Sequence, residues 1–176
     1  DAFDILAFKF PDLSLTLAGS APGVSDSQSN EALEKLHASQ KKWGERIQYH
    51  GHVKDISTLF SPGSIHICPS IWDDPSPNII LEAKALGAPS IGFARGGIPE
   101  LIKSGREGYI VPTETAEALT EAIGCLIQAP NKIIEYGRAA QNSLDDRFNY
   151  QDHVTQWVQA VEDEYRAASQ REPDEA

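Results

Sequence analysis

Short apolar runs alternate with longer segments of helical periodicity along most of this chain, and this alternation limits the folds open to it. Each run is three to six residues long, and the segments between them place apolar residues three or four positions apart. This order of elements predicts an α/β fold with a parallel sheet, in a Rossmann-like three-layer α/β/α architecture. The predicted strands are Leu13–Leu17, Ile47–His50, Ser64–Pro69, Pro89–Phe93 and Tyr109–Val111.

Eight helical segments are expected between and after these strands. Asn30 is a candidate cap for the second of them, and Trp43 and Trp157 are expected to pack between helices. The predicted helices are Ala2–Phe8, Asn30–Trp43, Asp55–Phe60, Asn78–Gly87, Pro99–Ser104, Glu114–Gln128, Asn131–Asp145 and Asp152–Ala168.

The length of 176 residues, with 40% of them hydrophobic, suits one domain with its own core. We expect that domain to span residues 1–168 and residues 169–176 to form a solvated acidic tail. The sequence contains no methionine and begins inside a predicted helix. We therefore expect it to be part of a longer polypeptide whose upstream portion includes a further domain.

The charge of the chain excludes one class of partner. A formal net charge of −11 argues against nucleic acid, because binding to phosphates needs a basic surface. The sequence contains no run of 18 apolar residues, so no transmembrane segment is predicted, and it does not open with a signal peptide. Cys68 and Cys125 lie far apart without a CxxC spacing. They are expected to be reduced, buried thiols of a cytoplasmic protein.

The loops that follow the predicted strands are the expected place for a ligand. In open parallel sheets, ligands bind beyond the carboxyl ends of the strands, where such loops form one rim. The loops concerned are Gly19–Asn30, Gly51–Asp55, Pro69–Asn78 and Ala94–Ile98.

The stretch Pro69–Glu82, with the sequence PSIWDDPSPNIILE, carries the most chemical information among them. It predicts a strand end, a loop stiffened by Pro75 and Pro77, and then a helix. The free N–H groups and the dipole of a helix N-terminus favour phosphate. The carboxylates Asp74 and Glu82 cannot hold phosphate, but they can accept hydrogen bonds from sugar hydroxyls. A diphosphate between two hydroxyl-bearing rings describes a nucleotide sugar.

Other interpretations of these residues remain open. Asp74 and Glu82 would also suit a loop surface and an exposed helix position. Asp73 and Asp74 could form a metal pair, but no third ligand accompanies them. The pair Gly96 and Gly97 would let the backbone approach a ligand closely, and a structural turn explains it about equally well.

Motifs for other chemistries are missing. Gly19 is not followed by GxGxxG, and the chain contains neither GxxxxGK[ST] nor GxSxG. His50 and His52 are expected to be local hydrogen-bonding residues, and His66 a histidine of the core or rim. We therefore expect no cofactor and no bound metal.

Several motifs together resemble the donor-binding half of the family 4 retaining glycosyltransferases, which have the GT-B fold. The resemblance covers about residues 3 to 167. It rests on Gly51-His52-Val53, Leu59-Phe60, PSIWDDPSPNIILEAKALGAPSI, GGIPELI, GREGYIV and the closing segment RFNYQDHVTQWVQAVEDEY.

The resemblance implies a role for each residue of the site. The family has two glutamates separated by seven residues, and this chain has Asp74 and Glu82 at that spacing. Asp74 would then bind hydroxyls of the donor sugar as the catalytic-site acid, and Glu82 would bind the ribose. The backbone of residues Ser76, Pro77, Asn78 and Ile79 would contact the diphosphate or the sugar. The base would lie beside Gly51, His52 and Val53, and Gly19 would border the diphosphate.

The resemblance also implies what the chain does and what it lacks. The chain would bind a UDP-, GDP- or ADP-linked sugar, and the sugar would be transferred to an acceptor hydroxyl. The transfer would need no metal, and an upstream domain would hold the acceptor. The family's first strand and its basic diphosphate loop do not precede Asp1, and Asp74 stands where the family usually has glutamate. We therefore expect weak donor affinity and no transfer by this chain alone. The alternatives are a non-catalytic scaffold module, or a nucleotide-sugar epimerase or phosphorylase domain.

Overall fold

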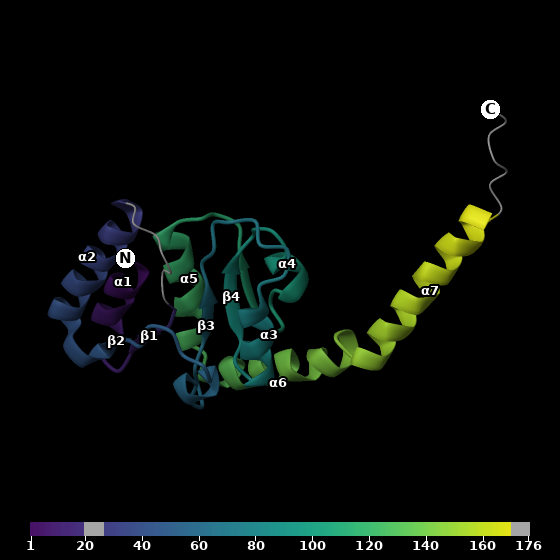
Figure 1. The fold of residues 1–176 in the computed structure, drawn as a ribbon. Coiled ribbons are helices and arrows are strands. Elements are labelled where there is room, and N and C mark those ends of the chain that lie inside the picture. Colours follow the sequence, from purple (N-terminus) through teal and green to yellow (C-terminus); the bar gives the residue numbers. More distant parts are fainter. Residues whose placement is uncertain (20–26, 170–176) are drawn as a thin grey trace.

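The computed structural model describes the backbone of residues 1–19 and 27–169, and within these ranges the side chains of all but residues 27–30 and 145–147. The described residues form a body of strands covered by helices, and the last helix, α7 (Tyr150–Ser169), extends away from it (Figure 1). The α/β class predicted from the sequence is confirmed.

The strands of the described residues form two parallel sheets. In the first, β1 (Leu15–Leu17) pairs with β2 (Ile47–Tyr49). In the second, β4 (Ser90–Phe93) lies between β3 (His66–Cys68) and β5 (Gly108–Val111). The prediction of one parallel sheet is therefore corrected. No strand in the described part of the chain lies between β1 and β3, so one edge of each is left without a strand partner.

Helices cover both faces of the larger sheet, as the three-layer prediction requires. On one face α5 (Ala116–Ile127) and α6 (Pro130–Arg147) pack against β4 and β5. On the other face lie α3 (Asn78–Ala85) and α4 (Ile98–Leu101). The first core cluster is Ile91, Phe93, Val111, Leu119, Leu126, Ile133 and Tyr136, and the second is Cys68, Ile80, Ile98, Leu101 and Ile102. All four residues of β4 are buried, which makes it the centre of the domain.

The first two helices pack beside the smaller sheet. Trp43, near the end of α2 (Ser27–Trp43), meets the rings of Phe3 and Phe8 from α1 (Ala2–Lys9) edge to face, as expected for a packing tryptophan. Arg46 donates hydrogen bonds to the carbonyls of Ala7, Phe10 and Leu13. It is the last residue of the one-turn 3-10 helix η1 (Gly44–Arg46) and ties α1 to the start of β2.

Several predicted boundaries are corrected by one to three residues. The second helix begins at Ser27 rather than at Asn30, so Asn30 lies inside it and is not its cap. The predicted helix Asp55–Phe60 is the 3-10 helix η2 (Ile56–Leu59), which Asp55 caps through a hydrogen bond from the Ser57 amide. The predicted tail begins inside α7, which continues to Ser169, and residues 170–176 lie outside the described residues.

A buried ion pair fastens α3 to its surroundings. The side chains of Lys84 and Glu107 are each 1% exposed, and their Nζ and Oε2 atoms lie 2.8 Å apart. Lys84 also donates to Ser143 of α6, and the Lys103 amide donates to the Glu107 carboxylate. Burial alone raises the pKa of the Glu107 carboxyl, but these hydrogen bonds and the charge of Lys84 outweigh it and hold the pKa below its usual value.

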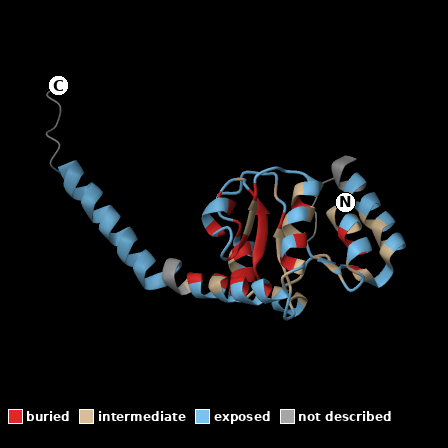
Figure 2. Ribbon diagram, turned by 180° about the vertical axis from the view of Figure 1, so that it is seen from behind, coloured by how far each residue is buried: buried red, intermediate tan, exposed pale blue. Residues whose placement is uncertain are grey.

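Two expectations about burial are wrong. Trp157 does not pack between helices, because α7 has no buried residue, and the helix is exposed along its length (Figure 2). Cys68 is buried as expected, but Cys125 lies exposed on α5. Both cysteines are free thiols.

In the described part of the chain, no helix is both long and apolar enough to span a membrane.

Candidate functional site

The loop between β3 and α3 is held in place by the glycine pair that follows β4. The Gly97 amide donates to the Asp74 carbonyl at 2.8 Å. A Cβ atom at Gly97 would lie 1.9 Å from the Pro75 carbonyl oxygen, and one at Gly96 would lie 2.3 Å from the Asp74 carbonyl oxygen. Gly96 also has a φ of +46°. The close approach that these glycines permit is therefore to the backbone of the loop.

Asp74 forms the turn at the tip of this loop. Its side chain is exposed, and its Oδ1 accepts a hydrogen bond from the Ser76 amide at 2.9 Å. Such a turn closed by a carboxylate fixes the loop locally and leaves the second oxygen available. Burial raises the pKa of the Cys68 thiol at the end of β3, and the nearby charge of Asp74 contributes to this rise. The acid thus lies close to the carboxyl end of β3.

Helix α3 begins where the sequence predicted, at Asn78. Pro77 occupies the cap position with no side-chain hydrogen bond to the helix, so the first amides point outward from the helix start. Pro77 and Ile80 are buried and anchor the first turn, whereas Ser76, Asn78 and Ile79 are exposed. Glu82 lies one turn further on and is exposed.

A second group of predicted residues meets at the carboxyl ends of β1 and β2. The Gly19 amide donates to the Gly51 carbonyl at 2.6 Å, and the Tyr49 hydroxyl donates to the Gly19 carbonyl. Gly19 and Gly51 have φ values of +128° and +61°, which favour glycine. His52 is exposed and Val53 half-buried directly after this contact.

The two groups are internally connected but are not joined to each other. No hydrogen bond among the described residues links the Gly19–Gly51 contact with the Asp74–Gly97 contact, and each belongs to a different sheet. Open hollows occur elsewhere, one along α7 and one bordered by Arg106 and α6.

Arg95 is a basic residue of the rim that the sequence analysis did not single out. It is the second residue after β4, and its guanidinium pairs with Glu114 at 2.6 Å and with Asp73 at 3.7 Å. It therefore reaches the loop that carries Asp74. The signal was available, since a lone arginine stood between a buried strand and the Gly96–Gly97 pair.

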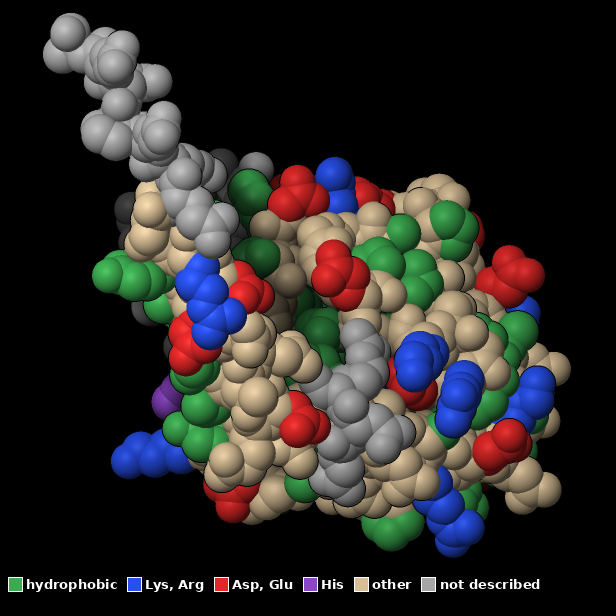
Figure 3. Space-filling model, turned by 90° about the vertical axis from the view of Figure 1, so that its right-hand side faces the viewer, with side chains coloured by type: hydrophobic (Ala, Val, Ile, Leu, Met, Phe, Trp, Pro, Cys, Tyr) green, Lys and Arg blue, Asp and Glu red, His purple; other side chains and the backbone are tan. Residues whose placement is uncertain are grey.

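Acidic and basic side chains are mixed elsewhere on the surface. On the face seen in Figure 3, Lys and Arg are interspersed with Asp and Glu rather than gathered into one basic patch. This distribution agrees with the net charge of −11 and offers nothing resembling a nucleic-acid footprint on that face.

His50 and His66 make hydrogen bonds, as expected for His50. His50 lies 3.4 Å from the Gln48 side chain, and His66 Nδ1 lies 3.1 Å from the Ser90 hydroxyl across the paired strands β3 and β4. Burial lowers the pKa of His66 to about 4, so its ring is neutral at pH 7. Among the described residues, no group of three His, Cys, Asp or Glu side chains is placed to hold a metal ion.

Comparisons with curated proteins give several relatives. The chain is 31% identical to spore coat protein SA of Bacillus subtilis over 145 residues, which are 80% of this chain and 38% of that protein. It is 29% identical to the alpha-maltose-1-phosphate synthase of Mycolicibacterium smegmatis over 149 residues, with the same two coverages. The chain thus spans less than half the length of these relatives.

Solved structures share the fold. Sucrose-phosphate synthase from Thermosynechococcus elongatus superposes with a TM-score of 0.75 at 25% identity, over 94% of this chain and 42% of that one. Anabaena HepE in complex with UDP gives a TM-score of 0.77 at 22% identity, over 92% and 44%. The family described as "Glycosyl transferases group 1" matches residues 1–129. With its parallel α/β fold and these relatives, the chain belongs to the group 1 glycosyl transferases.

Proposed function

We propose that residues 1–168 are the C-terminal, donor-binding domain of a family 4 retaining glycosyltransferase. The complete enzyme would transfer a sugar from a nucleoside diphosphate sugar to an acceptor hydroxyl in the cytoplasm. The family match and the GT-B relatives support this assignment. The chain spans 38% to 44% of the relatives described above, which leaves room in them for an acceptor domain.

One observation carries the proposal. The Gly97–Asp74 hydrogen bond holds a rigid loop that delivers the chain to the start of α3, where no side chain caps the helix. Exposed carboxylates precede and follow that start in the sequence, at Asp74 and Glu82. This arrangement offers amides to a diphosphate and hydroxyl acceptors to the groups on either side of it.

The roles that the family resemblance implies are part of this proposal. Asp74 binds hydroxyls of the donor sugar, and Glu82 binds the ribose. The amides of Asn78 and Ile79 contact the diphosphate or the sugar, whereas the Ser76 amide is already bound to the Asp74 side chain. The loop after β2 borders the base. Arg95 keeps the loop oriented through Asp73. The developing charge on the leaving diphosphate is stabilised by helix amides and by basic side chains of the remaining polypeptide.

We further propose that the first strand of the domain lies upstream of Asp1, between β1 and β3. The unpaired edges of these two strands support this placement, because each strand pairs in parallel on one edge and has no strand partner on the other among the described residues. The segment after that strand would supply the cationic groups that the described rim lacks. The chain alone would then bind donors weakly and transfer no sugar.

A titration tests the donor site directly. UDP-glucose, GDP-mannose and ADP-glucose are added separately to the isotope-labelled protein, and amide shifts are followed by NMR. We expect saturable shifts at residues 76–82 for one base. Asp74→Asn keeps the turn acceptor for the Ser76 amide but removes the charge, so it should weaken binding about five- to tenfold, as should Glu82→Gln. Glu135→Gln on the exposed face of α6 is the control and should bind as the parent does.

The titration also decides between the proposal and its rival. Shifts at residues 76–82 that saturate and weaken in the two variants support donor binding. No shifts with any of the three donors at millimolar concentration would favour a scaffold module instead. Sugar transfer by this chain alone would contradict the proposed dependence on upstream residues.

A further inference from the structure

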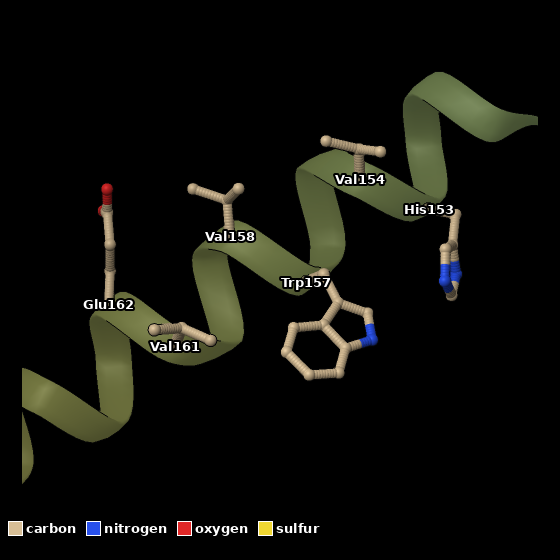
Figure 4. A pocket seen from close by; sticks show the side chains of 6 residues that line it. All are labelled: His153, Val154, Trp157, Val158, Val161 and Glu162. Atoms are coloured by element: carbon tan, nitrogen blue, oxygen red, sulfur yellow. The ribbon is translucent and has the colours of Figure 1, made fainter.

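Two open hollows on the described surface differ in their chemistry. The hollow along α7 is mostly apolar, and Figure 4 shows Val154, Trp157 and Val158 among the side chains that line it. The other hollow lies on α6, and its volume of about 430 Å³ is in the range of sites for small ligands. Because most of its lining is polar or charged, this hollow suits a polar ligand. The lining includes Arg106, Asn131, Ile134, Glu135, Arg138 and Asn142.

One side of α6 supplies most of this lining. The lining residues recur every three or four positions from Asn131 to Asn142, so they share one side of the helix. Ile134 is 54% exposed there, whereas Ile133 and Tyr136 on the other side are buried in the first core cluster. The hollow therefore faces solvent on a helix that the core holds in place.

Arg106 reaches the hollow from the turn that precedes β5. Its amide donates to the Lys103 carbonyl at 3.1 Å, and the Glu107 amide donates to the same carbonyl at 2.9 Å. The Lys103 amide donates in turn to the Glu107 carboxylate at 3.0 Å. The backbone from which Arg106 extends is thus fixed, and its guanidinium remains free to orient towards a ligand.

Arg106 and Arg138 are cations without a partner in the part of the chain that the structure describes. Neither side chain makes a hydrogen bond or an ion pair there, whereas Lys84 and Arg95 are paired with carboxylates. Glu135 is the acid of the lining, so its charged groups sum to a positive charge in a chain that carries −11. A guanidinium binds two oxygens of a phosphate at once. The hollow therefore favours a phosphate over a neutral ligand.

The other lining groups suit a ring with hydroxyls. The amides of Asn131 and Asn142 both donate and accept hydrogen bonds, and the ionised Glu135 carboxylate only accepts them. Glu135 would repel a second phosphate but can accept from a hydroxyl. Ile134 offers an apolar surface to the C–H groups of a ring. A sugar that carries one phosphate presents a partner to each of these groups.

The hollow lies beside the buried ion pair that fastens α3. Arg106 directly precedes Glu107, and Asn142 directly precedes Ser143. Glu107 and Ser143 both accept hydrogen bonds from Lys84 of α3. A ligand that bridges Arg106 and α6 would therefore hold together the two segments that anchor α3. It should stabilise the folded domain, because it binds a surface that unfolding destroys.

We propose that the hollow between Arg106 and Arg138 binds a sugar phosphate. The two guanidinium groups bind the phosphate, and Asn131, Glu135 and Asn142 bind hydroxyls of the ring. This site goes beyond the proposed function and does not depend on it, because the hollow shares no residue with the Asp74 loop or with the start of α3.

An NMR titration of the isotope-labelled chain tests the site. Glucose 6-phosphate, glucose and inorganic phosphate are added separately at millimolar concentration. We expect saturable amide shifts at residues 104–107 and 131–142 with glucose 6-phosphate, and affinities about tenfold weaker for the other two probes, because each of them lacks half of the contacts.

Paired variants separate these contacts from the overall charge. Arg106→Gln/Arg138→Gln should weaken glucose 6-phosphate binding about tenfold or more. Lys9→Gln/Lys41→Gln removes the same charge from exposed positions of α1 and α2 and should bind as the parent does. Glucose 6-phosphate should also raise the Tm of the parent and of this control, but not the Tm of the arginine variant. Both arginines are exposed, so the arginine variant should fold.

Three results would overturn the inference. An absence of shifts at residues 104–107 and 131–142 would show that the hollow binds no sugar phosphate. Equal affinity for inorganic phosphate would reduce it to an unselective anion site. Shifts confined to residues 76–82 would assign the phosphate to the proposed donor site instead. The titration with nucleotide sugars reports on residues 76–82, so failure of that site and failure of this one give different results.

Discussion

Gly97→Ala should dislocate the loop that carries Asp74. The added Cβ would lie 1.9 Å from the Pro75 carbonyl oxygen, and ordinary contact begins at 3.4 Å, so that carbonyl must retreat by about 1.5 Å. Both partners are backbone, so no flexible side chain can absorb the shift. The Gly97–Asp74 hydrogen bond would be stretched or lost. Strain of this kind costs about 1–3 kcal/mol, and the lost hydrogen bond about 1 kcal/mol more.

Two measurements follow from that estimate. A loss of about 2–4 kcal/mol lowers the Tm of a domain of this size by about 4–16 °C, which thermal denaturation followed by circular dichroism resolves. Displacing the acid and the helix start by about 1 Å should weaken donor binding at least tenfold in the NMR titration.

Two other glycines supply the controls. Gly137→Ala puts a Cβ 2.0 Å from the Gly87 carbonyl oxygen, a clash of the same kind between α6 and the end of α3. It should cost similar stability and leave donor affinity within twofold. Gly124→Ala in α5 meets nothing closer than 3.7 Å and should stabilise the protein by about 0.5–1 kcal/mol. Unchanged affinity in Gly97→Ala, or an equal loss in Gly137→Ala, would refute the link between this glycine and the site.

Three further changes test other parts of the structure. Lys84→Met should destabilise the domain by about 3–5 kcal/mol in urea denaturation, because it leaves Glu107 buried without its cation, and adding Glu107→Leu should recover most of the loss. The pKa of His66 is about 4 in the folded protein and about 6.5 in the unfolded chain, so protonation of its ring favours unfolding. The free energy of unfolding should therefore fall as the pH drops from 6.5 towards 4, with a loss of about 2 kcal/mol at pH 5. It should level off below pH 4. His66→Gln should remove that part of the slope. Arg95→Gln should lower the free energy of unfolding by less than about 1 kcal/mol, since the ion pairs of Arg95 are partly exposed. It should nevertheless weaken donor binding, because the loop is held less firmly. Donor affinity equal to that of the parent protein would contradict the orienting role of Arg95.

Local pattern was sufficient for most of the fold. Each strand is a short apolar run between turn residues, and α3 begins at Asn78 because Pro75 and Pro77 prevent an earlier start. The start of α2 was misplaced because Ser27, Ser29 and Asn30 are all competent caps, and pattern alone does not rank them. The single sheet was wrong for a different reason, since strand order depends on pairing between distant segments.

The site was only partly predictable for the same physical reason. Spacing identified Asp74, Glu82 and the glycine pair as candidates, but it did not reveal that the backbone of residues 73–75 is what approaches Gly96 and Gly97. Likewise, Trp157 was expected to pack between helices, whereas the described domain leaves it exposed. Sequence pattern identifies surfaces that need partners, and three-dimensional packing decides which partner is present.

The two open strand edges have a practical consequence for anyone handling this chain by itself. A row of unpaired amides and carbonyls is a template on which another molecule can add its own strand. Here β1 and β3 each offer such a row, though only three residues long. Preparations at high concentration should therefore self-associate slowly, and adding the strand that we propose to lie upstream of Asp1, as a peptide or by co-expression, should suppress this.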